Sequence, residues 1–227
     1  MKKIISLILL CALVLTLGAC TAEKTNTNKL TSNTATPTEQ TQNNNAANIP
    51  QNSAPALDEN LNYYADIDVK DYGKIVIKLN PKAAPATCAH FVRLVNEGFY
   101  NGLTFHRIMA GFMMQGGCPS GTGFGSADEN VVGEFAINGY DNPIKHTRGA
   151  VSMARSDDPN SASSQFFIVH EDATFLDGKY AGFGRVIDGM AVVDAVCTTA
   201  QPIDGNGTIP ANAQPVISTI TIRTETK

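Results

Sequence analysis

Between residues 60 and 227 the chain repeatedly alternates short apolar–polar runs with glycine-rich turns. The runs 64–69 and 74–79 are separated by the turn signal Asp71-Tyr72-Gly73, so together they predict a β-hairpin. A period of two is typical of strands with one buried face, which restricts the chain to β-rich folds. Further short strands are expected at 103–108, 112–115, 150–153, 165–169, 181–187 and 216–223.

Two segments have a helical pattern instead. In 84–96 large apolar residues recur at helical spacing, with Pro85 suited to the first turn and Gly98 to the end. A second short helix fits 190–197. Many short strands, two helices and no regular strand–helix–strand rhythm argue for an antiparallel barrel or sandwich.

The first twenty residues have the pattern of a targeting segment. Lys2 and Lys3 precede an apolar run, 4–17, that is too short for a confident permanent membrane span. The run ends in Leu17-Gly18-Ala19-Cys20, which resembles the lipobox of bacterial lipoproteins. We therefore expect a signal peptide at 1–19, lipidation of Cys20 and an extracytoplasmic protein anchored to the bacterial cell membrane. A plain secretory signal or an N-terminal anchor helix are the alternatives.

The next segment, 20–59, is dominated by Thr, Asn, Ala, Gln and Ser. It has too few large apolar residues to form a core, so we predict a flexible tether followed by one folded domain at 60–227. The net charge is −4 and no basic stripe occurs, which argues against a nucleic-acid partner. No heptad pattern occurs, so a monomer is expected. The domain's three cysteines, Cys88, Cys118 and Cys197, imply no disulfide framework, although one bridge could form among them.

Common catalytic and cofactor motifs are absent from the sequence. It contains no Gly-x-Ser-x-Gly elbow, no P-loop and no His-Glu-x-x-His. The glycine-rich stretch 121–125 lacks the third glycine at nucleotide-binding spacing, and Cys88 and His90 lie on different faces of their helix. We expect neither a cofactor nor a metal.

One motif stands out, Phe105-His106-Arg107-Ile108-Met109-Ala110-Gly111-Phe112-Met113-Met114-Gln115-Gly116-Gly117. It resembles the signature of cyclophilins, and three later motifs agree with that family in order: 152–155, 163–168 and 175–186. The resemblance spans about 63–224. It implies a closed eight-stranded antiparallel β-barrel capped by two helices, with the site on the outer face. It also implies peptidyl-prolyl cis/trans isomerase activity on proline-containing polypeptides.

That reaction needs a selective hydrogen-bond donor rather than a nucleophile. An X–Pro bond resists rotation by roughly 18–20 kcal/mol because the nitrogen lone pair is delocalised. Twisting localises the lone pair, so a fixed cationic donor stabilises the twisted amide more than either planar form. By resemblance Arg107 occupies the catalytic position, and Gln115 would fix the substrate backbone or hold Arg107.

The resemblance also implies the substrate-binding residues. An apolar slot takes the proline ring, backbone groups of Ala154 and Arg155 hold the extended substrate, and His106 supports Arg107. Alternation places Phe166 in the core and Phe167 at the site. The expected binding residues are His106, Phe112, Met113, Gly121, Ala154, Arg155, Gln165, Phe167, Phe175, Leu176 and Tyr180.

The chain departs from the family pattern at three positions around the site. Phe175 stands where cyclosporin-sensitive members carry Trp, so weak cyclosporin inhibition with retained activity is expected. Arg155 replaces a common Asn, and its longer side chain is expected to alter preference beside the proline. Tyr180 replaces a frequent His on the rim of the pocket. The leading hypothesis is a folding catalyst for secreted or cell-envelope proteins. A proline-segment binding module with incidental turnover and a holdase chaperone are the alternatives.

Overall fold

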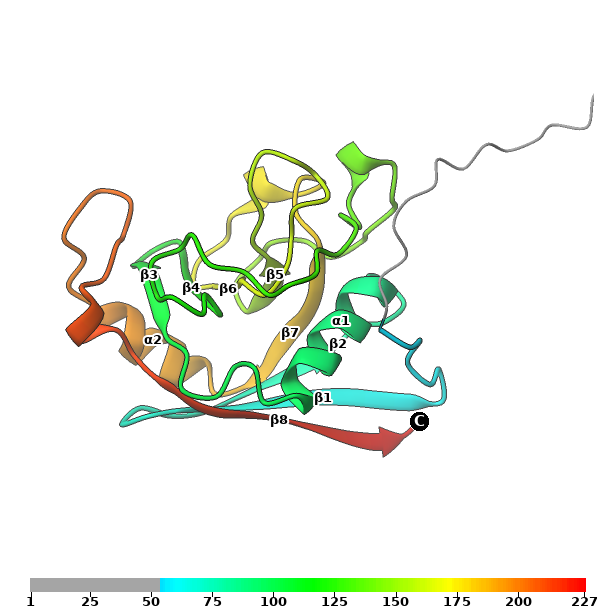
Figure 1. Ribbon diagram of the computed structural model, residues 1–227, viewed down its shortest axis with the longest axis horizontal. Coiled ribbons are helices and arrows are strands. Elements are labelled where there is room, and N and C mark those ends of the chain that lie inside the picture. The colour runs from blue at the N-terminus through cyan, green and yellow to red at the C-terminus, as the bar shows by residue number, and fades with distance from the viewer. Residues whose placement is uncertain (1–53) are drawn as a thin grey trace, which may run out of the picture. The chain divides into compact units, whose positions relative to one another are not determined.

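The computed structural model describes residues 54–227, drawn in colour in Figure 1. The expected signal peptide 1–19, the lipidation site Cys20 and the tether as far as residue 53 lie outside the described residues. The described part contains eight strands and two α-helices. In chain order these are β1 (Leu61–Val69), β2 (Gly73–Leu79), α1 (Pro85–Asn96), β3 (Phe105–Met109), β4 (Met113–Gly116), β5 (Ala150–Met153), β6 (Phe166–Val169), β7 (Gly182–Asp188), α2 (Met190–Thr199) and β8 (Ile217–Thr226).

All eight strands form one antiparallel sheet in the order β3-β4-β6-β5-β7-β2-β1-β8. The expectation of a closed barrel is wrong, because β3 and β8 form no ladder and the sheet is an open half-barrel. The free edge of β3 bonds instead to the segment 207–209: Ile108 N–H donates to the Gly207 carbonyl and Ile209 N–H to the His106 carbonyl. The chain at the start of β8 reaches the start of β3, where the Phe105 N–H donates to the Pro215 carbonyl and Thr104 forms an isolated bridge with Val216.

The β1–β2 hairpin has the predicted turn, in which Asp71 and Gly73 both take positive φ, 66° and 122°. On its other side β1 pairs with β8 from Leu61 opposite Thr226 onward, and the Lys227 N–H donates to the Asn60 carbonyl. The chain therefore enters and leaves this domain side by side, at the end of β8 marked C in Figure 1.

The core lies between the concave face of the sheet and α1. The Phe91 ring of α1 packs 5.2 Å from Tyr100, 5.7 Å from Phe166 and 5.1 Å from Phe183, centroid to centroid. All four side chains are fully buried, and burying each stabilises the fold by about 1.5–3 kcal/mol. The start of α1 is capped from a distance, because the Glu134 carboxylate accepts the N–H groups of residues 86 and 87.

The described residues can also be searched for disulfide bonds, membrane-spanning helices and metal-binding clusters. Cys88, Cys118 and Cys197 are all buried free thiols, so the one bridge that their number allowed is not formed. Within 54–227 no helix has the length and apolar character needed to cross a bilayer. The same residues contain no group of three or more His, Cys, Asp and Glu side chains placed to hold a metal ion.

Candidate active site

Arg107 projects from β3 directly opposite Gln115 on β4. Its Nη1 donates to Gln115 Oε1 at 3.3 Å, and its guanidinium carbon lies 5.9 Å from the centre of the Phe112 ring. Partial burial lowers the pKa of Arg107, while Tyr180 and Asp204 oppose that shift. The guanidinium stays charged because its ordinary pKa lies far above neutrality. It is a half-buried cation held in place beside an aromatic face.

A loop that the sequence did not single out fixes the other side of this guanidinium. Arg107 Nε donates to the Asn206 carbonyl at 2.7 Å. Asp204 holds the loop by accepting the N–H groups of Asn206 and Thr208, and these backbone bonds lower the pKa of its carboxyl. Gly207 has φ 87°, and a Cβ there would meet the Ile108 carbonyl oxygen at 2.8 Å. The turn Asp204-Gly205-Asn206-Gly207 is visible in the sequence, but nothing local connects it to Arg107.

Gln115 and Gln165 connect Arg107 to the glycine-rich loop. Gln115 Nε2 donates to Gln165 Oε1 at 2.9 Å, and Gln165 Nε2 donates to the carbonyls of Gly123 and Gly125, both at 2.8 Å. These bonds orient both amides: Gln115 must present its oxygen to Arg107 because its nitrogen is used by Gln165. The glycine-rich stretch 121–125 therefore forms a wall beside the site.

Next to Arg107 is a small hollow of about 120 Å³. It is lined both by apolar side chains, among them Phe112 and Phe167, and by the polar side chains of Arg107, Gln115 and Arg155. Such a hollow can hold a compact apolar ring while an adjoining amide lies under the guanidinium. The residues that line it are Arg107, Phe112, Met113, Gln115, Ala154, Arg155, Phe167, Leu176 and Tyr180, nine of the thirteen predicted catalytic and binding residues.

The alternation argument holds on β6. Phe166 belongs to the main core cluster, whereas Phe167 packs with Met113 and Leu176 at the hollow. A buried polar group supports Phe167 from behind: the His146 ring stacks on it with 5.9 Å between centroids.

Two polar side chains fix this His146 ring. Its Nδ1 lies 3.0 Å from Asp177 Oδ1, and its Nε2 lies 3.1 Å from Ser152 Oγ. Burial lowers the pKa of His146, although Asp177 opposes this. The sequence analysis assigned these residues no role, and only the fold brings them together.

The four predicted residues outside the hollow have other surroundings. Gln165 acts through Gln115, as described above. The Phe175 side chain is 62% exposed, and its ring lies 5.5 Å from that of Phe112. Gly121 is placed beside Gln214, whose Nε2 donates to the Gly121 carbonyl. His106 is buried beside the glycine-rich loop: it is 4% exposed, a Cβ on Gly123 would meet its ring at 3.4 Å, and burial with the Arg107 charge lowers its pKa to about 4.

The backbone edge expected at residues 154 and 155 is partly used by the fold. The Ala154 N–H donates to the Gln165 carbonyl at 2.9 Å, so this donor is not left for an extended ligand. The Arg155 guanidinium lies over the Tyr180 ring at 4.8 Å and the Phe135 ring at 5.1 Å. It therefore forms a fixed cationic rim on the side of the hollow opposite Arg107.

Comparisons with known proteins agree with this geometry. The sequence model of the family described as cyclophilin type peptidyl-prolyl cis-trans isomerase/CLD matches residues 64–223. The peptidyl-prolyl cis-trans isomerase B of Bacillus subtilis is 47% identical over 122 residues, which cover 54% of this chain and 82% of that protein. A peptidyl-prolyl cis-trans isomerase of Helicobacter pylori is 44% identical over 126 residues, which cover 55% of this chain and 74% of that protein.

Solved structures show the same similarity. A cyclophilin type peptidyl-prolyl cis-trans isomerase of Cryptosporidium parvum, crystallised in the presence of the dipeptide ala-pro, superposes with a TM-score of 0.62 at 29% identity. The superposition covers 71% of this chain and 99% of that one. Cyclophilin AquaCyp293 from Hirschia baltica gives a TM-score of 0.57 at 26% identity, over 70% and 76% of the two chains.

Proposed function

Since this chain belongs to the cyclophilin-type peptidyl-prolyl cis-trans isomerase family and is such an isomerase, we propose that it accelerates the folding of secreted or cell-envelope proteins through Arg107. The observation that carries the residue assignment is the geometry of Arg107. It is held by Asn206 and Gln115 at the edge of an apolar hollow of the size of a small ring.

The mechanism follows from where the charge lies. A prolyl ring in the hollow formed by Phe112, Met113 and Phe167 places its nitrogen beside the guanidinium. As the amide twists, the nitrogen lone pair becomes an acceptor, and an N–H of Arg107 donates to it. A preorganised charged donor of this kind contributes about 10²–10³ in rate, and no covalent bond forms or breaks.

Gln115 and Arg155 have supporting roles in this proposal. Gln115 keeps the guanidinium aimed at the hollow, since its oxygen is committed to Arg107 by the bond to Gln165. Arg155, fixed over the Tyr180 ring, lines the opposite rim and contacts the residue next to proline.

The cellular role rests on the N-terminal sequence. Lys2, Lys3, the apolar run and Leu17-Gly18-Ala19-Cys20 support export and lipid attachment at Cys20. Proteins emerging on the outer side of the membrane fold without ATP, and isomerisation uses none. Uncatalysed X–Pro exchange takes roughly tens to hundreds of seconds, so it limits the folding of such clients.

The test compares three forms of the full-length chain: wild type, Arg107→Ala and the matched control Arg223→Ala. Arg223 lies on the outer face of β8, paired with Asp66 and Glu225. The rate of cis-to-trans relaxation of an Ala-Pro peptide should fall about a hundredfold in Arg107→Ala and stay near wild type in Arg223→Ala. Equal rates in wild type and Arg107→Ala, with both proteins folded, would reject the role of Arg107.

A second measurement addresses the cellular role. Radiolabelled palmitate should be incorporated into the wild-type chain in a bacterial host but not into Cys20→Ala. Refolding of a secreted protein with a native cis-proline should be faster with wild type than with Arg107→Ala. If the client refolds equally fast with wild type and Arg107→Ala, the hollow beside Arg107 acts as a proline-segment binding module.

A further inference from the structure

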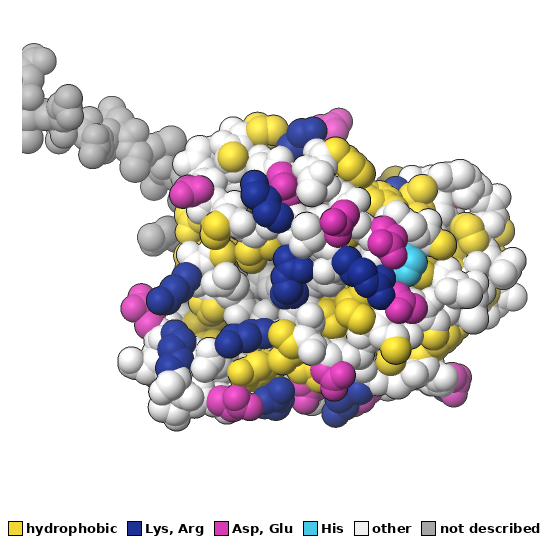
Figure 2. Space-filling model, turned by 180° about the vertical axis from the view of Figure 1, so that it is seen from behind, with side chains coloured by type: hydrophobic (Ala, Val, Ile, Leu, Met, Phe, Trp, Pro, Cys, Tyr) yellow, Lys and Arg dark blue, Asp and Glu magenta, His cyan; other side chains and the backbone are white. Residues whose placement is uncertain are grey.

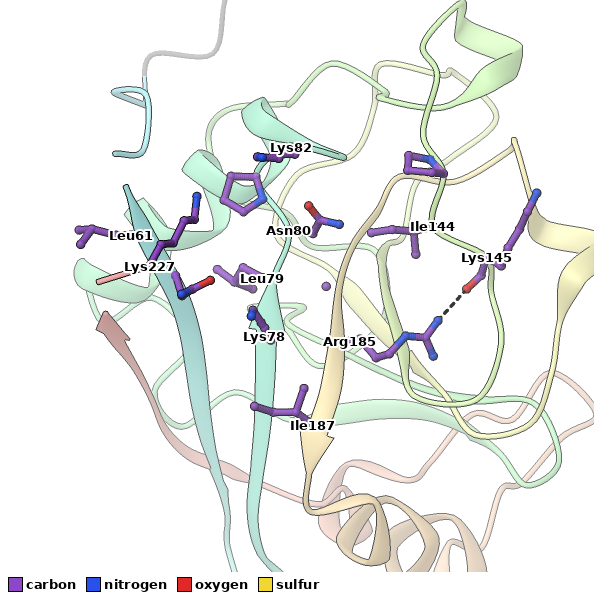
Figure 3. A pocket seen from close by; sticks show the side chains of 14 residues that line it. Leu61, Lys78, Leu79, Asn80, Lys82, Ile144, Lys145, Arg185, Ile187 and Lys227 are labelled. Carbon is purple, nitrogen blue, oxygen red and sulfur yellow. Dashed lines mark hydrogen bonds between the residues drawn. The ribbon is translucent and has the colours of Figure 1, made fainter. Parts of the chain in front are cut away.

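A second, larger hollow lies apart from the one beside Arg107, and we propose that it is a docking groove for an acidic, extended segment of the client polypeptide. This rests on the proposed function, because the partner is an isomerase client. The hollow measures about 560 Å³ and lies along β1, β2 and β7 (Figure 3). It shares no lining residue with the hollow beside Arg107.

The charge of this groove is opposite to that of the domain. From residue 60 onward the chain has 13 basic and 17 acidic residues, yet none of the described residues lining the groove is Asp or Glu. Lys78, Lys82, Lys145, Arg185 and Lys227 line it, and all five side chains are exposed. In Figure 3 Lys78 and Lys82 stand on one side and Lys145 and Arg185 on the other. The face seen in Figure 2 carries several Lys and Arg side chains around apolar surface, with Asp and Glu side chains among them.

Most of these charges are not neutralised by the protein. Within the described residues only Lys145 forms an ion pair, at 3.6 Å from Asp177. Arg185 donates to the carbonyls of Arg148 and Lys145 and to the Thr147 hydroxyl, so its guanidinium is fixed but keeps its full charge. Lys78 lies 5.8 Å from the centre of the Tyr64 ring. Lys227 donates to the Glu59 carbonyl and forms no ion pair with the described residues either. A groove with four such cations attracts a partner that carries carboxylates.

The floor of the groove is apolar, which favours a peptide over a flat anionic surface. Leu79, Pro143, Ile144 and Ile187 line it, and Ile187 is 53% exposed. A planar bilayer touches the cationic rim but cannot reach a concave floor. In an extended peptide alternate side chains point in opposite directions, so apolar residues can occupy the floor while acidic ones meet the rim.

The position of the groove suits a client that is held at two points. In the sheet order, β5 separates β7, β2 and β1 from β6, β4 and β3, which carry the catalytic residues. A flexible client can therefore present a proline to Arg107 while a separate acidic stretch occupies the groove. Tethering at a second point raises the local concentration of the proline without any new contact at the catalytic site.

The experiment compares three peptides on the full-length chain. The first is a short Ala-Pro peptide, the second adds alternating Glu and Leu residues through a Gly-Ser linker, and the third has Lys in place of Glu. The readout is the ratio of kcat/KM for each extended peptide to that for the short one, measured by NMR exchange. We expect the acidic extension to raise kcat/KM about tenfold at low ionic strength, through KM, and the basic extension to give no gain. High salt should remove the gain.

Charge reversals then locate the effect. Lys78→Glu and Lys82→Glu should each remove most of the gain, whereas Lys70→Glu should keep it. Lys70 is exposed, lies just after β1 and does not line the groove, and its replacement changes the net charge equally. If a charge reversal impairs folding, Lys78→Gln and Lys82→Gln give the same comparison.

Three results would overturn the proposal. They are no gain from the acidic extension, an equal loss in Lys70→Glu, or binding to phosphatidylglycerol vesicles that depends on Lys78 while the peptide gains nothing. Absence of turnover on the short peptide would instead reject the proposed function. In that case fluorescence anisotropy of the labelled Glu-Leu segment with wild type, Lys78→Glu and Lys70→Glu still decides whether the groove binds it.

Discussion

Arg107 and Gln115 face each other across β3 and β4, with Nη1 and Oε1 3.3 Å apart, and the bond from Gln115 Nε2 to Gln165 orients the amide so that its oxygen faces Arg107. The orientation of the Arg107 guanidinium thus depends on the Gln115 amide, which is itself oriented by Gln165 and the glycine-rich loop. The two side chains act together, and substituting them singly and jointly measures how strongly they are coupled.

Gln115→Met keeps the length of the side chain but removes its acceptor. We expect kcat/KM on an Ala-Pro peptide to fall about tenfold, which corresponds to the loss of one hydrogen bond to a charged group, roughly 1.5 kcal/mol. In Arg107→Ala the same change should cost little more, because the two residues act together. Fully multiplicative losses in the double variant would contradict this coupling.

Acid should destabilise the protein before its carboxylates are protonated. Burial lowers the pKa of His90, His106 and His146, that of His106 to about 4. An unfolded histidine binds a proton near pH 6.5, so below that pH the unfolded chain carries more protons than the native one. The free energy of unfolding should therefore rise between pH of about 4 and about 6.5 and level off above it.

Urea unfolding across this range measures the effect, and His106→Gln provides the control. Removing one such histidine should reduce the slope by at most about 1.4 kcal/mol per pH unit. A slope that is identical in wild type and His106→Gln would show that His106 takes up its proton equally in both states.

Cys118 should give a second pH effect, at alkaline pH. Burial disfavours its thiolate, but hydrogen bonds from Ser120 and from the N–H groups of Gly125 and Gly123 outweigh this and lower the pKa to about 7. Since an unfolded cysteine titrates near pH 8.5, the native state loses its proton first, and stability should rise between about pH 7 and 8.5. It should be lost again as pH falls through 7.

This rise should be absent in Cys118→Ser, measured by urea unfolding at the two ends of that range. The other two thiols within residues 54–227 do not produce it, because burial raises the pKa of Cys88 and raises that of Cys197 to about 12. A rise of the same size in Cys118→Ser would exclude the thiolate as its source.

Phe175 should set the response to cyclosporin. Its ring is exposed and packs against that of Phe112, so it presents a flat apolar face without a hydrogen-bond donor. Phe175→Trp adds an indole N–H at the same rim, and one neutral hydrogen bond of about 1 kcal/mol should tighten cyclosporin inhibition about fivefold. Turnover of the Ala-Pro peptide should change little. Phe175→Leu reduces the contact with Phe112 and adds no hydrogen-bond donor, so it should not tighten inhibition.

The strands and helices were predictable because each is specified by neighbouring residues. Alternation placed β1, β2 and β8 and separated Phe166 from Phe167, and helical spacing with Pro85 placed α1. Nine predicted residues meet at one hollow, as the resemblance implied, although their roles in binding and catalysis stay predictions.

What the sequence did not reveal depends on contacts between distant segments. His146 gives no local sign that it will stack under Phe167 with Asp177 and Ser152 as partners, and Asn206 gives none that its carbonyl will meet Arg107. The openness of the sheet has the same origin. Whether β8 or the segment 207–209 takes the edge of β3 depends on how the Asp204 turn folds back.

The pairing of β1 with β8 gives this domain a modular property. Because Asn60 and Lys227 are joined by a backbone hydrogen bond, a chain that enters at β1 leaves at almost the same point. A unit with adjoining ends can be spliced into a surface loop of a host protein with short linkers. Its ends can equally be fused and new ones opened at an exposed turn such as Asp71, giving a circular permutant with the catalytic hollow untouched.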